Sequence, residues 1–211
     1  MPAGSSVGLP ATDLLDGGSK LGSQVVLVPV KSFDQAKRRL GSVLGDDDRE
    51  ALVRRMAEGV LAAAHPLPAA VVCDDPVVAT WAREHGALVV WEPGRGLNGA
   101  VEEGIARLMT LGVEVVVVAH GDLPDATGLG TLADFDGVTL VPDRRGDGTN
   151  VIRLPTGTGF RFSYGPGSFQ RHRAECGRLG LPCRVELDSP LRLDVDVPED
   201  LVLVTRQPSA S

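Results

Sequence analysis

The sequence predicts an α/β fold built on one doubly wound, mostly parallel sheet. Short apolar runs alternate with helical patterns up to about residue 120, the order expected of right-handed βαβ crossovers. The run VEVVVVA at 113–119 is almost wholly apolar, which is typical of a strand covered by helices on both faces. After residue 120 the strands are of mixed character, so we expect a mixed sheet.

The regular half of the chain is expected to hold four strands and three helices. Strands are predicted at 24–30, 69–73, 87–91 and 113–119. Three aspartates at 46–48 favour a helix N-terminus, apolar residues then recur at helical spacing, and Pro66 stops the pattern; a helix is predicted from about residue 48. Further helices are predicted over about 76–85 and 98–109.

The second half is expected to hold shorter elements. Strands are predicted at 137–143, 149–155, 183–187 and 191–195, with a helix at about 168–179 and a terminal helix in VPEDLVLV. Because no repeat or linker interrupts 24–205, we expect a single domain there. Residues 1–23 are expected to form a disordered Gly/Ser-rich leader, and 206–211 a flexible tail.

Composition limits the classes of function. The chain has 211 residues, of which 43% are hydrophobic and 23% charged, as in soluble globular proteins. The net charge of -7 argues against partners such as nucleic acid or anionic membrane. No run is long enough to span a membrane, and the three cysteines form neither a CxxC pair nor a zinc spacing. A cytoplasmic location is expected.

Three aspartates are predicted to meet at one edge of the sheet. Asp122 follows the strand at 113–119, and Asp194 and Asp196 lie two positions apart in LRLDVDVPEDL. In open α/β sheets ligands bind outside the carboxyl ends of the strands, and such a cluster needs a cation to neutralise it. Oxygen ligands without histidine or cysteine favour Mg²⁺. The structural alternative is that these aspartates only cap turns or helices.

The loop after the first strand, PVKSFDQAKRRL, is basic. It contains Lys31, Lys37 and Arg39, and only one other lysine, Lys20, occurs in the chain. This loop contains neither GxGxxG nor GxxxxGK[ST], so it is not one of the usual phosphate loops. The cations face the same edge as Asp122, where they would hold a polyphosphate. The alternative is a solvated basic patch.

A second anion site is predicted around GDGTN at 146–150 and YGPGSFQRHR at 164–173. The glycines lead into a helix that begins near Ser168, whose free N–H groups and hydroxyl would bind an anion. Thr149 adds a hydroxyl, and Arg161, Arg171 and Arg173 add positive charge nearby. Together they indicate a small acceptor bearing phosphate or carboxylate, although each alone is also typical of a plain helix cap or hairpin. The four histidines are interpreted as structural: His65, His85, His120 and His172.

Taken together these motifs resemble one enzyme family. The motifs are PVKSFDQAKRRL, Leu97-Asn98, GDLP at 121–124, Gly148-Thr149, GPGS at 165–168 and DVDVPEDL at 194–201. They resemble the guanylyltransferase family of coenzyme F-420 biosynthesis, within the Rossmann-like nucleotide-diphospho-sugar transferase group, over nearly all of 24–204 in order. The resemblance implies transfer of GMP from GTP to phosphoenolpyruvate with release of pyrophosphate. Related acceptors, 2-phospho-L-lactate and 3-phosphoglycerate, are the alternatives; an arginine-rich composition like that of high-GC actinobacteria favours phosphoenolpyruvate.

The resemblance also implies roles for individual residues. Lys31, Arg39 and Asp122 would be catalytic, and Lys31, Lys37 and Arg39 would lie along the triphosphate, with Asn98 near the nucleoside. Thr149, Gly165 and Ser168 would bind the acceptor, and Asp122, Asp194 and Asp196 would hold Mg²⁺. The chain departs from the family pattern at Arg38, Asn150 and Gly167, which bears on the choice of acceptor.

Two other functions remain open from the sequence. A glycosyltransferase acting on a nucleotide sugar would also use paired aspartates at a metal, and a regulatory module would bind GTP without turnover. The sequence does not fix the oligomeric state, with a homodimer among the options. It also leaves open a downstream transferase that consumes a labile product.

Overall fold

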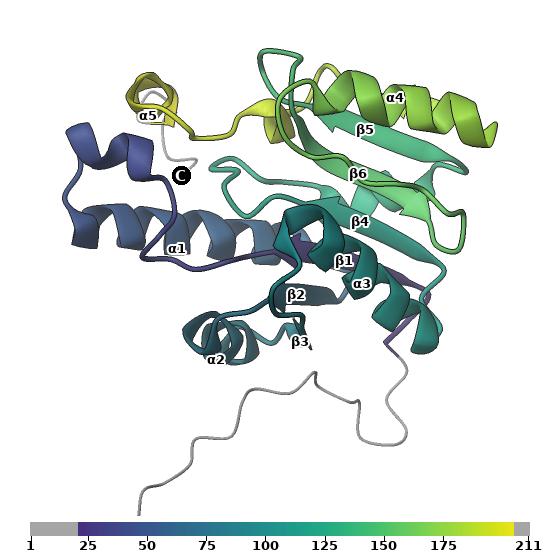
Figure 1. Cartoon of the computed structure of the whole chain (residues 1–211), viewed down its shortest axis with the longest axis horizontal. Coiled ribbons are helices and arrows are strands. Elements are labelled where there is room, and N and C mark those ends of the chain that lie inside the picture. The colour runs from purple at the N-terminus through teal and green to yellow at the C-terminus, as the bar shows by residue number, and fades with distance from the viewer. Residues whose placement is uncertain (1–20, 205–211) are drawn as a thin grey trace, which may run out of the picture.

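A computed structural model describes residues 21–204 of the protein, in which a seven-stranded sheet has the order β3-β2-β1-β4-β6-β5-β7 (Figure 1). Four consecutive neighbours in this order are parallel, and each is joined to the next in sequence by a helical crossover. The predicted doubly wound, mostly parallel mixed sheet is therefore confirmed. The parallel strands are β1 (Gln24–Pro29), β2 (Ala69–Cys73), β3 (Leu88–Trp91) and β4 (Val115–Ala119).

The other half of the sheet is mixed. β6 (Thr149–Pro155) lies antiparallel between β4 and β5 (Val138–Pro142), and the register between β5 and β6 shifts at Val141 and Pro142. The edge strand β7 (Cys183–Val185) pairs parallel with β5. Because β6 begins where β4 ends, the start of β6 lies at the same edge of the sheet as the carboxyl ends of the parallel strands.

Helices cover both faces of the sheet and make two hydrophobic cores. α1 (Asp46–Ala63) and α2 (Pro76–Glu84) pack on one face, and α3 (Gly96–Thr110) and α4 (Ser168–Leu179) on the other (Figure 1). The strands between them are buried on both faces, as the apolar run of β4 predicts. The short elements are η1 (Arg38–Ser42), η2 (Leu129–Asp134), η3 (Pro190–Arg192) and α5 (Pro198–Val204).

Two predicted elements differ from the structure. The prediction of a strand at 191–195 is wrong: Pro190 opens the 3-10 turn η3, whose first amide is capped by the Ser189 side chain, and the following residues run as an extended loop. The strand predicted at 183–187 ends at Val185. The helix predicted from residue 48 begins at Asp46, because all three aspartates occupy its first turn. Residues 1–20 and 205–211, on which most of the predicted leader and the whole tail fall, lie outside the described residues.

Backbone contacts bring distant loops to the carboxyl end of β4. The amide of His120 donates to the carbonyl of Asn150 in β6 at 3.0 Å, and the amide of Val195 donates to the carbonyl of Asp122 at 3.3 Å. The chain that follows η3 therefore lies against the residue after β4. Over residues 21–204, every helix is too short or too polar to cross a lipid bilayer.

Candidate functional site

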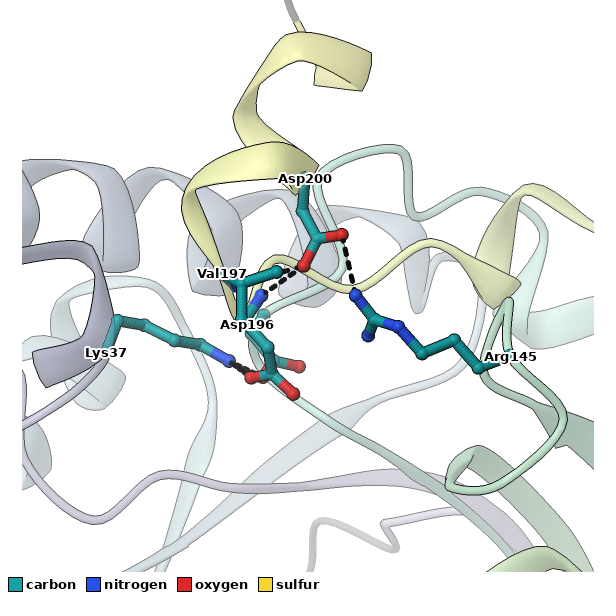
Figure 2. A network of polar contacts seen from close by, with 6 residues as sticks. Lys37, Arg145, Asp196, Val197 and Asp200 are labelled. Atoms are coloured by element: carbon teal, nitrogen blue, oxygen red, sulfur yellow. Dashed lines mark hydrogen bonds and ion pairs between the residues drawn. The ribbon is translucent and has the colours of Figure 1, made fainter. Parts of the chain in front are cut away.

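The centre of the site is a lysine held between two aspartates. Lys37 Nζ forms ion pairs with Asp122 Oδ2, just after β4, and with Asp196 Oδ1 at 2.5 Å, which belongs to the loop before α5. Figure 2 shows Lys37 reaching from its own loop toward Asp196. Lys37 of the basic loop therefore lies with Asp122 and Asp196 at the sheet edge where the sequence predicted the aspartates to meet.

The backbone of Lys37 is adapted to this contact. Its φ of 52° places it in the left-handed region, and no other non-glycine residue between 21 and 204 has a positive φ of this kind. This conformation is unfavourable for a lysine and is typically retained where the surrounding structure requires it. Here it turns the chain into η1 while the lysine side chain, 11% exposed, reaches the acids.

The charges at this edge influence one another strongly. Burial alone would lower the pKa of Lys37, but the neighbouring carboxylates of Asp122 and Asp196 raise it above its usual range. Burial favours the neutral form of Asp122, yet the Lys37 ammonium holds its pKa below the ordinary value. Burial and the charges of Asp122 and Asp196 raise the pKa of Asp194 to about 6. One lysine therefore neutralises only part of the cluster.

The three aspartates offer the oxygen ligands that a divalent cation prefers, but they are not arranged around one. Asp122 Oδ1 is buried and has no hydrogen-bond partner among the described residues. No group of three acidic, histidine or cysteine residues between 21 and 204 has ready-made ligand geometry, and the Lys37 ammonium is paired with two of the carboxylates. Mg²⁺ therefore remains a prediction.

Asp200 braces this cluster, and the sequence reasoning missed it. Its fully buried carboxylate accepts hydrogen bonds from the amides of Asp196 and Val197, both at 3.0 Å. Arg144 and Arg145, from the turn between β5 and β6, donate to it at 2.5 and 3.2 Å; the bond from Arg145 is drawn in Figure 2. Burial alone would raise the pKa of Asp200, but these hydrogen bonds and arginine charges hold it below the ordinary value. The position of Asp196 thus depends on the β5–β6 turn.

Two adjoining cavities open beside the lysine. A cavity of about 270 Å³ is lined by Lys31, Lys37, His120 and Asp122, among others. A larger one of about 560 Å³ lies at the carboxyl ends of β1, β2 and β3, and both share Pro29, Val30, Lys31 and Leu97 in their walls. Two carboxylates, Asp74 and Glu92, line the larger cavity.

Not every residue implied for the nucleotide lies in these cavities. Lys31 lines both, but Arg39 lies on the exposed side of η1 and lines neither. Asn98 also lines neither; its Oδ1 accepts a hydrogen bond from the amide of Tyr164 at 2.7 Å and so joins α3 to the loop before α4. The structure gives Asn98 a bracing contact where a nucleoside contact was expected.

The residues implied for the acceptor do come together. The hydroxyl oxygens of Thr149 and Ser168 lie 3.4 Å apart, both residues are buried, and the carbonyl of Gly165 accepts the amide of Ser168 at 3.0 Å. Gly165, with a φ of 114°, makes the turn that leads into α4.

The prediction of free N–H groups at the start of α4 is wrong for its first residues. The side-chain carboxylate of Asp147 accepts a hydrogen bond from the amide of Gly167 at 3.0 Å. The backbone carbonyl of Asp147 accepts one from the amide of Phe169 at the same distance. An internal carboxylate therefore occupies part of the expected anion site, and the buried hydroxyls of Thr149 and Ser168 are its other polar groups.

Two histidines interpreted as structural lie at the site. His120 lines the smaller cavity, and its Nε2, like the hydroxyl of Tyr164, is buried without a partner in the described part of the chain; the two rings lie 4.9 Å apart. His172 Nδ1 lies 3.0 Å from Thr149 Oγ1. The signal for His172 was its position four residues after Ser168, which places both on one face of α4. No pattern in the sequence indicated Tyr164.

Comparison with known families decides the assignment. The sequence profile described as "Guanylyl transferase CofC like" matches residues 24–206. The chain belongs to this family. Its relatives include the phosphoenolpyruvate guanylyltransferase of Sphaerobacter thermophilus, 33% identical over 84% of this chain and 90% of its own length. That of Rubrobacter xylanophilus is 35% identical over 85% of this chain and 92% of its length.

Solved structures support the fold of this CofC-like chain. A candidate nucleotide-diphospho-sugar transferase from Desulfovibrio desulfuricans G20 aligns with a TM-score of 0.71 at 20% identity, covering 90% of this chain and 89% of its own. A nucleotidyl transferase from Methanothermobacter thermautotroptrophicus aligns with a TM-score of 0.61 at 15% identity, covering 86% and 95%. At these identities the likeness establishes the fold alone.

Proposed function

We propose that this chain transfers GMP from GTP to phosphoenolpyruvate, with release of pyrophosphate, in coenzyme F-420 biosynthesis. Relatives that match most of the chain carry the name phosphoenolpyruvate guanylyltransferase. The observation that carries the proposal is the position of the centre formed by Lys37, Asp122 and Asp196 between two different environments. Cavities that share Lys31 in their walls lie on one side of it, and the buried hydroxyls of Thr149 in β6 and Ser168 in α4 lie on the other.

This arrangement suits two polyanions that repel each other. We place the triphosphate in the smaller cavity along Lys31 and Lys37, with the α-phosphorus beside Asp122. The base then lies in the larger cavity at the ends of β1, β2 and β3, and the acceptor approaches from the side of Thr149 and Ser168. Each ligand has its own part of the edge, so the two meet only at Asp122.

The chemistry needs alignment and charge neutralisation more than a base. An oxygen of the acceptor phosphate forms a bond to the α-phosphorus of GTP, the bond from that phosphorus to the α–β bridging oxygen breaks, and its electron pair leaves with pyrophosphate. The attacking phosphate is already ionised, so no side chain has to remove a proton. Lys31 and Lys37 would stabilise the leaving charge. Mg²⁺ held by Asp122, Asp194 and Asp196 would neutralise the phosphates as a Lewis acid.

The larger cavity also favours guanine over adenine. Guanine presents two adjacent donors, N1–H and the N2 amino group, which a carboxylate can accept together, whereas the corresponding edge of adenine presents an acceptor at N1. Glu92 is engaged, since Arg107 Nε lies 3.4 Å and Arg95 Nε 3.9 Å from its carboxylate. Asp74 has neither a hydrogen bond nor an ion pair within residues 21–204, so it is the carboxylate that we assign to the base.

The test is a turnover experiment with defined substrates. The purified protein is incubated with GTP, Mg²⁺ and, in turn, phosphoenolpyruvate, 2-phospho-L-lactate and 3-phosphoglycerate; pyrophosphate is measured and the product is weighed at once by mass spectrometry. We expect phosphoenolpyruvate to give the most product, and chelation of the metal to stop release. Turnover of a nucleotide sugar, or GTP binding without pyrophosphate release under any condition, would contradict the proposal.

A further inference from the structure

The hydrogen-bond direction at His172 is fixed by the backbone. The amide of Ser163 donates to His172 Nε2 at 3.0 Å, and an amide N–H can only donate, so Nε2 must carry a lone pair. A neutral imidazole has one ring proton, which must then lie on Nδ1. His172 Nδ1 is 3.0 Å from the Thr149 hydroxyl oxygen, so the histidine donates and Thr149 accepts.

The surroundings keep His172 neutral and in one orientation. The residue is fully buried, and the rings of Phe160, Phe162 and Tyr164 pack around it with centroids 5.8, 6.3 and 5.1 Å away. Burial, with the positive charge of Arg171, lowers the pKa of His172 to about 4. Protonation would place a second N–H against the Ser163 amide, so a single tautomer fits the site.

Because its oxygen is engaged by His172, the Thr149 hydroxyl is left to act as a hydrogen-bond donor. Its oxygen accepts from His172, and the Ser168 hydroxyl lies 3.4 Å away as a further donor to it. The Ser168 hydroxyl can equally accept from Thr149, because a hydroxyl is both donor and acceptor, so the Thr149 hydrogen points either to Ser168 or to a bound ligand. Thr149 begins β6, and the next residue, Asn150, accepts the amide of His120 at 3.0 Å, two positions before Asp122.

We infer that His172 is a positioning residue for the acceptor: it holds the Thr149 oxygen so that the hydroxyl hydrogen points to an oxyanion of the bound acid. A hydrogen bond to a charged acceptor is stronger than one between neutral groups, so a hydroxyl that can only donate selects for an anion. His172 does not itself touch the ligand and acts through Thr149. The inference rests on the proposed function in assigning that oxyanion to the acceptor.

A histidine that only fills the core is the competing explanation, and two substitutions separate the two. In His172→Asn the amide nitrogen takes the place of Nδ1 and keeps a donor toward Thr149. In His172→Gln the amide group takes the place of Nε2, which keeps a partner for Ser163 but removes the donor. Both replace the ring by a neutral primary amide, and they differ from each other by one methylene.

The expected result is a split between the two substrates. His172→Gln raises the KM for phosphoenolpyruvate about tenfold with the KM for GTP unchanged, whereas His172→Asn stays within about threefold of the wild type for both. In a Thr149→Val background, which has no hydroxyl to orient, His172→Gln adds no further rise in the acceptor KM. Equal effects of the two His172 substitutions, or additive effects in the Thr149→Val background, would overturn the inference.

A second measurement does not depend on turnover. Nitrogen-15 NMR of the ligand-free protein labelled at histidine reports which ring nitrogen carries the proton, and we expect the Nδ1–H tautomer for His172. An Nε2–H tautomer would also overturn the inference. If the wild type fails to join GTP to any of the three acids, the proposed function fails instead, and the tautomer measurement still decides the hydrogen-bond chain.

Discussion

The parallel half of the sheet and its antiparallel half build their parts of the site in different ways. In the parallel half, β1 to β4 end at one edge, and the site consists of cavities and charges on the loops that leave those strands. In the antiparallel half, the contributions of β6 and α4 are buried hydroxyls whose positions depend on hydrogen bonds to neighbouring side chains. The first half provides charge; the second provides orientation.

This difference predicts different outcomes when each half is altered. In the proposed arrangement the charges on strand-end loops stand beside the reacting phosphates, so their loss should reduce the rate and leave the fold in place. Polar groups of the antiparallel half are enclosed, so their loss should affect stability or the affinity for one substrate. The following expectations run from the largest effect to the smallest.

Asp122→Asn should reduce kcat by about 10²–10³-fold, because it removes a preorganised charge at the reacting centre. Pyrophosphate release with GTP and phosphoenolpyruvate measures the effect. Asp125→Asn, three residues further along the same loop, is the matched control and should stay near the wild-type rate. A near-normal rate for Asp122→Asn would contradict the comparison between the two halves, since the parallel half would then not supply a charge needed for the reaction.

Asp200→Ala should lower the free energy of unfolding by about 3 kcal/mol, because two amides and two arginines lose a buried carboxylate. Urea denaturation followed by circular dichroism gives the value. Glu199→Ala, the exposed neighbour in the first turn of α5, should change it by less than about 0.5 kcal/mol. Equal stabilities for the two variants would show that Asp200 is not the brace between the halves.

Acid should weaken the antiparallel half through His172. Its pKa is lowered from the ordinary 6.5 to about 4 in the folded protein, so between these values the unfolded chain binds more protons. The free energy of unfolding therefore falls as the pH drops through this window, by about 2 kcal/mol at pH 5 from this group. Denaturation at pH 7 and pH 5 tests it: His172→Asn, which cannot titrate there, should lose less stability than the wild type. An equal loss would contradict the assignment.

Base selection is the smallest effect and belongs to the parallel half. Inosine triphosphate differs from GTP only by lacking the N2 amino group, so the wild type should prefer GTP by about tenfold in kcat/KM. Asp74→Asn should reduce this ratio toward one, whereas Glu92→Gln should keep it, because Glu92 is engaged by two arginines. An unchanged ratio in Asp74→Asn would remove that carboxylate from the base site.

Most of the fold could be predicted from the sequence, because burial on both faces of β4 and helical periodicity in α1 and α3 are local patterns. The strand predicted at 191–195 failed since its alternation of apolar and charged residues also suits an extended loop, and only the cap from Ser189 and the missing partner strand distinguish the two. The edge strand β7 was overextended for a similar reason.

The charged part of the site was predictable and the enclosed part was not. Asp122 is indicated by its position directly after an apolar strand, and Lys37 is indicated by the scarcity of lysine elsewhere in the chain. The hydrogen bonds of His172, Asp147 and Asp200 connect elements distant in sequence, and each depends on a side-chain direction that only the folded chain sets. Their roles could not be obtained from spacing alone.

The carboxylate of Asp200 makes the short helix α5 a working part of the protein. It fixes the backbone of Asp196 and two arginines of the β5–β6 turn together. A nonsense codon or proteolytic cut just before this residue would spare every strand of the sheet and still release both the acid and the turn. An intact sheet is therefore not sufficient evidence that a shortened form of the protein is competent.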